Sequence, residues 1–259
     1  MMPPRYEVVD RLAVEVHLDR TTMARSAARA SAAYLRDIIA MQGEARVIFG
    51  CAPSQDGLLL ALLDPSICGV ALAWDRVIAF HMDEYVGLAD SNPQSFRYYM
   101  KRQPLERVRV AAFHSICADE TDSAAECARY AALLQEKPID LVCAGFGENG
   151  HLAFNDPPVA DFDDSTLVKV VEIDTACRQQ QVNDGCFRTL DEVPRLALTI
   201  TLPVFRQARR VSAVVPGVRK ASAVRAALRD PITPACPATI LRLHANAALY
   251  LDAQAASLL

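Results

Sequence analysis

The stretch Ile139-Asp140-Leu141-Val142-Cys143-Ala144, followed by Gly145-Phe146-Gly147, decides the fold class. A mostly apolar run of this length is typical of a strand that is buried on both faces, and such strands belong to parallel sheets. The glycines that follow it predict a tight turn at the end of the strand. Similar apolar runs occur at 46–50, 77–80, 167–173, 197–201, 211–215 and 247–251.

Helix-like segments separate these runs. The longest is expected to begin after a capping Asp19, to reach Gln42 and to end at Gly43. Because strands alternate with helices, we predict an α/β fold with a mostly parallel sheet and helices on both faces. No linker or repeat divides the chain, so one domain over residues 1–259 is expected. The other segments with a helical pattern are 58–63, 95–102, 122–135 and 217–229.

Composition excludes several classes of partner. The net charge is -4 and the basic residues are scattered, so neither nucleic acid nor an anionic membrane is an expected partner. No apolar stretch reaches the roughly 20 residues that span a bilayer. The eight cysteines form no C-x-x-C pair, which favours reduced thiols in a cytoplasmic protein over disulfides.

Polar residues gather after three of the predicted strands, where parallel sheets bind their ligands. The first segment, 50–57, contains Ala52, Pro53, Ser54 and Gln55 between a strand and a helix. Such a loop can aim backbone N–H groups at a phosphate, although it has neither the spacing nor the lysine of a nucleotide-binding loop. Phosphate binding and a plain turn between strand and helix both remain open for it.

The second segment, 81–88, places Asp83 and Glu84 directly after a strand. A carboxylate at this place is a candidate general base. Because adjacent residues of an extended chain point in opposite directions, at most one of the two should face a substrate. A capping or salt-bridging pair is the alternative interpretation.

The third segment, 145–158, contains three glycines and then a histidine, His151, with Asn149, Asn155 and Asp156 around it. An isolated histidine is more often a satisfied polar side chain than a catalytic group. A histidine that follows a glycine-rich turn, with a carboxylate close by, is a better catalytic candidate. The spacing of the histidines matches no metal-binding motif, so no metal is expected.

The strings Phe-His-Met-Asp-Glu-Tyr-Val-Gly-Leu at 80–88 and Gly-Phe-Gly-Glu-Asn-Gly-His-Leu-Ala-Phe-Asn-Asp-Pro at 145–157 resemble the glucosamine-6-phosphate deaminase family. That family includes the related 6-phosphogluconolactonases, and the resemblance extends over nearly the whole chain. It implies a Rossmann-like domain that converts the sugar phosphate glucosamine 6-phosphate to fructose 6-phosphate and ammonia without a cofactor. It leaves open whether the chain forms a homo-oligomer.

The resemblance also implies residue roles. Asp83 matches the base that moves a proton between two sugar carbons, and His151 matches the histidine that opens the sugar ring. Asn149 and Asp156 match the acidic pair that supports this histidine. Lys220, together with the loop Ala52–Asp56, matches the group that binds the phosphate.

Four departures from the family pattern stand out. Asn149 replaces an aspartate, and Asp156 replaces a glutamate, which shortens its reach by one methylene. Asp56 would repel a phosphate unless it points away from it. The family's phosphate-binding arginine has no clear counterpart, and Arg178 is the nearest candidate. The alternatives to a deaminase are a sugar-phosphate lactonase, which would need only His151, and a sugar-phosphate sensor without catalytic activity.

Overall fold

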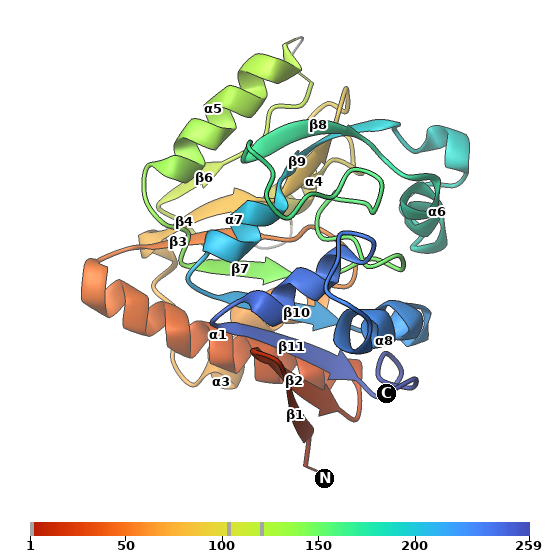
Figure 1. Cartoon of the computed structure of the whole chain (residues 1–259). Helices are drawn as coiled ribbons and strands as arrows, with labels where there is room; N and C mark the ends of the chain where they lie inside the picture. The colour runs from red at the N-terminus through yellow and green to blue at the C-terminus, as the bar shows by residue number, and fades with distance from the viewer. Residues whose placement is uncertain (1–2, 103–104, 120–121) are drawn as a thin grey trace.

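The computed structural model describes residues 3–102, 105–119 and 122–259. Its centre is a sheet of eight strands in the order β1-β2-β11-β10-β7-β3-β4-β6 (Figure 1). All neighbouring pairs are parallel except β1 and β2, so the predicted α/β class is confirmed. The strands are β1 (Arg5–Val9), β2 (Leu12–His17), β3 (Ala45–Phe49), β4 (Val77–His81), β6 (Ala112–His114), β7 (Leu141–Ala144), β10 (Val211–Val215) and β11 (Ala247–Asp252).

A second, antiparallel sheet lies beside the first and consists of β5 (Asp83–Tyr85), β9 (Leu196–Ile200) and β8 (Val168–Glu172). The sequence predicted the last two as further strands of the parallel sheet, which is wrong. Burial gives the reason: β8 alternates between buried and more exposed residues, whereas every residue of β3, β7 and β10 is buried. A strand with one solvated face fits an antiparallel sheet.

Helices cover both faces of the large sheet (Figure 1). On one face lie α1 (Arg20–Gln42), α2 (Asp56–Leu62) and α3 (Pro65–Cys68), and on the other lie α5 (Ser123–Gln135), α7 (Leu202–Gln207) and α8 (Ala221–Arg229). The remaining helices are α4 (Phe96–Arg102), α6 (Thr175–Asn183) and the short 3₁₀ segments η1 (Trp74–Arg76), η2 (Leu190–Glu192), η3 (Val218–Lys220) and η4 (Pro237–Leu243).

The longest helix begins and ends where the sequence predicts. The Asp19 side chain accepts a hydrogen bond from the Thr22 backbone at 2.8 Å, and the Thr22 hydroxyl completes a capping box. At the other end, Gly43 adopts a left-handed φ of 84° and donates to Ile39. No helix among the described residues is long and apolar enough to cross a membrane.

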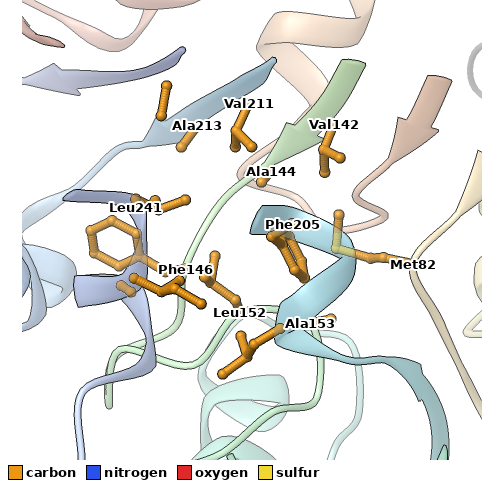
Figure 2. Close-up of a cluster of buried hydrophobic side chains, with 14 of the residues drawn as sticks. Met82, Val142, Ala144, Phe146, Leu152, Ala153, Phe205, Val211, Ala213 and Leu241 are labelled. Atoms are coloured by element: carbon orange, nitrogen blue, oxygen red, sulfur yellow. The ribbon is translucent and has the colours of Figure 1, made fainter. Parts of the chain in front are cut away.

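A hydrophobic cluster holds the glycine-rich loop against the sheet. Phe146, Leu152 and Ala153 of this loop are buried, and they gather below β7 and β10 with Phe205 of α7 and Leu241 of η4 (Figure 2). Burial of each larger side chain, such as Phe146 or Leu152, contributes about 1.5–3 kcal/mol to the stability of the fold. The loop that carries the polar residues is therefore fixed by its own apolar residues.

Candidate active site

A cleft lies at the carboxyl ends of the central parallel strands, as the sequence predicts. The loops that follow β3, β4, β7 and β10 all contribute to it, and one wall comes from α4 and α6. The residues that line it are Gly50, Cys51, Ala52, Ser54, Gln55, Met82, Asp83, Phe96, Gly145, Phe146, Gly147, His151, Ala153, Phe154, Gln180, Gln181 and Lys220.

Asp83 faces this cleft and is only 7% exposed. Burial, and next the charge of Glu84, raise the pKa of Asp83 well above its usual value. A carboxylate with a raised pKa is a stronger base, which suits a group that must remove a proton from carbon. Among the described residues, no hydrogen bond or ion pair occupies the Asp83 carboxylate.

Glu84 points to the other side of the strand, as the alternation predicts. Its carboxylate accepts hydrogen bonds from the Ser95 hydroxyl at 2.8 Å and from the backbone N–H groups of Phe96 at 3.1 Å and Arg97 at 2.8 Å. Glu84 therefore anchors the start of α4. The capping interpretation holds for Glu84, while Asp83 remains free for chemistry.

The imidazole of His151 is held by Asn149. The Asn149 Oδ1 atom lies 2.7 Å from His151 Nδ1 and also accepts from the His151 backbone N–H at 3.1 Å. Because a carbonyl oxygen can only accept, Nδ1 carries the proton of the neutral ring and Nε2 presents a lone pair. His151 lines the cleft, so this arrangement prepares a base at its edge.

Asp156 supplies the negative charge that Asn149 lacks. Its Oδ1 atom lies 3.1 Å from His151 Nδ1 and accepts from Asn149 Nδ2 at 2.9 Å, while Oδ2 accepts from the Asp174 backbone at 3.0 Å. Burial acts to raise the pKa of Asp156, but the hydrogen bonds from His151, Asn149 and the Asp174 N–H together hold it below its usual value. The shorter side chain therefore still reaches the imidazole as a carboxylate.

Two glycines are needed for this arrangement. A Cβ atom at Gly147 would lie 2.0 Å from His151 Cε1 and 2.3 Å from Nδ1, so only glycine leaves room for the imidazole. Gly150 has a φ of +82°, which side chains rarely adopt, and a Cβ there would lie 2.6 Å from Cys236 Sγ. The glycine-rich sequence thus makes space for His151 as well as a turn.

The loop after β3 reaches the cleft through Ala52, Ser54 and Gln55, and Lys220 faces the same space from η3. Lys220 is 7% exposed, and its amino group makes no ion pair within the part of the chain that the structure describes. Burial lowers the pKa of Lys220 although Asp184 and Glu148 oppose this shift. A buried cation without a partner indicates a site for an anion.

Two predicted phosphate ligands do not line the cleft. Pro53 has no N–H to donate, and its carbonyl accepts a hydrogen bond from the Arg20 guanidinium on the outside. Arg178 points away: its guanidinium donates to the backbone carbonyls of Leu190 at 2.5 Å and Val193 at 3.0 Å. The structure therefore places Arg178 away from the cleft, because α6 turns this residue towards η2.

Asp56 points away from the cleft, so its carboxylate is not placed to repel a phosphate there. Its Oδ1 atom accepts a hydrogen bond from the Tyr99 hydroxyl at 2.6 Å, and Asp56 does not line the cleft. The carboxylate is therefore directed at α4 and away from the space in front of Ser54 and Lys220.

Sequence reasoning singled out Arg178 from the segment 177–185, which it also considered for contact with another substituent of the substrate. In the structure, α6 brings Gln180 and Gln181 to the cleft and Cys177 to within 3.8 Å of His151 Nε2. Donor atoms of His151, Asp156 and Cys177 lie within 4.8 Å of one another, a group that could hold a metal ion. In the structure, hydrogen bonds already occupy His151 and Asp156. No apolar period marks residues 175–183, so the sequence offered little signal for this helix.

Known proteins share this fold and sequence pattern. The family described as glucosamine-6-phosphate isomerases/6-phosphogluconolactonase matches residues 18–250. A glucosamine-6-phosphate deaminase of Listeria welshimeri is 35% identical over 184 residues, which are 71% of this chain and 76% of the relative.

Two solved structures are also similar. A monomeric glucosamine-6-phosphate deaminase superposes with a TM-score of 0.86 at 26% identity, covering 95% of this chain and 99% of the other. A 6-phosphogluconolactonase of Shewanella baltica has a TM-score of 0.76 at 16% identity, covering 95% of this chain and 100% of its own. The second likeness concerns the fold alone.

Proposed function

Since the chain belongs to the family of glucosamine-6-phosphate isomerases and 6-phosphogluconolactonases, we propose that it converts glucosamine 6-phosphate to fructose 6-phosphate and ammonia. One observation carries the proposal: Asp83 and His151, which come from different strand ends, face one cleft together with Lys220. A proton-transfer base, a second base and an anion site are the three groups that this reaction needs.

The first step assigned to the site is ring opening. Nε2 of His151 takes the proton of the anomeric hydroxyl, and the imidazolium then protonates the ring oxygen. The Asn149 and Asp156 oxygens near Nδ1, at 2.7 Å and 3.1 Å, stabilise the positive charge that forms in between. The product of this step is the open-chain aldehyde.

The second step is the carbon chemistry. The Asp83 carboxylate removes the proton from the second carbon while the aldehyde oxygen takes a proton from water, which gives an enol-type intermediate. Asp83 then returns its proton to the first carbon, and the protonated nitrogen at the second carbon gives one proton back to the solvent. The resulting imine at the second carbon is hydrolysed by water, so that a carbonyl replaces the amine and ammonia leaves. Burial raises the pKa of Asp83, which makes its carboxylate a stronger base for taking this proton.

A phosphate would lie against Lys220, Ser54 and the backbone of the loop after β3. The same burial that lowers the pKa of Lys220 strengthens its attraction to an anion. We also propose a cytoplasmic location, which is supported by eight free thiols.

The test is to incubate the purified protein with glucosamine 6-phosphate and to measure ammonia and fructose 6-phosphate. Asp83→Asn should reduce kcat by at least about a hundredfold, as expected for loss of a general base. Asp163→Asn is the matched control, because Asp163 is an exposed carboxylate paired with Arg206 on the surface. Wild-type rates in Asp83→Asn would refute the assigned base, and hydrolysis of 6-phosphogluconolactone in place of deamination would indicate the lactonase reaction.

A further inference from the structure

The end of the cleft that would receive the phosphate carries little positive charge. Among the described residues that line the cleft, Lys220 is the one lysine or arginine. A phosphate monoester carries a charge of about −1.5 to −2 at neutral pH. One lysine therefore leaves part of that charge without a counter-charge.

The nearby arginines are occupied elsewhere. Arg219 forms ion pairs with Asp184 at 2.6 Å and with Glu148 at 3.3 Å. The same two carboxylates act to raise the pKa of Lys220, and the single charge of Arg219 offsets only part of theirs, so Arg219 has no charge left for a phosphate. Arg178 is directed at the carbonyls of Leu190 and Val193.

The α6 wall fills the remaining space with two amides. Gln180 is engaged, because its Oε1 accepts from the Glu148 backbone at 2.8 Å and its Nε2 lies 3.3 Å from Asp184 Oδ2. Gln181 also lines the cleft, and its side chain makes no hydrogen bond within the described part of the chain. Its amide therefore has no side-chain hydrogen bond to the described residues and lines the same cleft as Lys220, where it can donate to an anion or to a neutral hydroxyl.

We propose that Gln181 is a specificity-determining residue, which makes the cleft bind the far end of the sugar with one charge and one amide. This inference rests on the proposed function and refines its substrate class. An amide donates a hydrogen bond to a phosphate but adds no counter-charge, so it favours a phosphate over a hydroxyl less than a second cationic side chain would. The enzyme should therefore prefer phosphorylated amino sugars over unphosphorylated ones. This preference should be weaker than that of an enzyme whose site has two cationic side chains.

The experiment compares kcat/KM for glucosamine 6-phosphate and for glucosamine in wild type and in Gln181→Arg. The ratio of the two values should rise about tenfold or more in the variant, which is the gain expected from a hydrogen bond to a charged group. Gln179→Arg is the matched control: it adds the same charge to the same helix, but Gln179 is exposed and bonds to Asn183. Its ratio should change less than about twofold, as for screened surface charges.

A binding measurement keeps the inference independent of turnover. Sorbitol 6-phosphate and sorbitol have no carbonyl or amine to react, so calorimetric titration with both reports recognition of the phosphate alone. The affinity ratio should again rise about tenfold in Gln181→Arg, even if no ammonia is produced by any variant. If wild type released no ammonia but the affinity ratio still rose in Gln181→Arg, the proposed function would be refuted and the role of Gln181 in binding would stand.

Two results would overturn the role of Gln181. One is an unchanged ratio in both Gln181→Arg and Gln181→Lys, with thermal unfolding showing that the variants are folded. The other is an equal rise in Gln179→Arg, which would indicate general attraction by the added charge.

Discussion

Replacing Gly147 with alanine should remove most of the activity without unfolding the protein. The added Cβ would lie 2.0 Å, 2.3 Å and 2.5 Å from Cε1, Nδ1 and Nε2 of His151. Ordinary contacts begin at about 3.4 Å, so the ring would have to move by about 1.4 Å. It cannot retreat freely, because Cys177 Sγ lies 3.8 Å from Nε2. A misplacement of about 1 Å can cost about a hundredfold in rate, which sets the expected loss in kcat.

The assay for Gly147→Ala is ammonia release, measured in wild type and in a His151→Ala background. If the alanine acts only by displacing the imidazole, it should cost about a hundredfold in wild type and close to nothing once His151 is absent. Thermal unfolding provides the control for folding, since φ at Gly147 lies outside the left-handed region and suits alanine. Unchanged kcat in Gly147→Ala, or an equal loss in both backgrounds, would refute this account of the loop.

Further outcomes are expected for four variants. Asp156→Asn should lower kcat by about a hundredfold with little change in KM, measured by steady-state kinetics, because the imidazolium of His151 loses its carboxylate. Asp83→Asn should stabilise the fold: burial raises the pKa of Asp83 in the folded state, so wild type loses stability as pH rises from the ordinary value through the raised one, by about 1.4 kcal/mol per pKa unit. The melting temperature of Asp83→Asn should therefore exceed that of wild type by more at about pH 8 than at about pH 5. A difference that does not change with pH would contradict this. Arg178→Met should lower stability by about 1–3 kcal/mol in urea and leave KM unchanged, whereas Lys220→Met should raise KM for the phosphorylated substrate at least about tenfold.

Local sequence signals predicted those parts of the fold that local interactions determine. The ends of α1 follow from a side-chain cap at Asp19 and a left-handed Gly43, which act within a few residues. The central strands could be predicted because they are buried along their whole length, so almost every residue in them is apolar. The pairing of β8 with β9 does not, because which sheet a half-buried strand joins depends on partners far away in the sequence.

The same division applies to the site. Asp83 and His151 could be predicted because each follows a recognisable strand, and the ends of parallel strands meet at one edge. The choice between Arg178 and Gln181 could not, because it depends on the rotation of α6 about its axis. Consecutive residues of a helix are separated by about 100°, so residues three apart point in directions that differ by only about 60°. Tertiary packing decides which of the two faces the cleft and which faces a neighbouring segment.

The pair Asn149 and Asp156 shows why a residue-by-residue comparison underestimates this site. An asparagine alone cannot stabilise an imidazolium with charge, and an aspartate alone is shorter than a glutamate. Together they form one unit, because Asn149 Nδ2 holds Asp156 Oδ1 at 2.9 Å and so keeps the carboxylate 3.1 Å from the ring. The charge that one position lacks is thus carried by the other, and Asn149 acts as a positioning residue for both groups. For this reason the two substitutions favour an active enzyme over a sensor without catalytic activity.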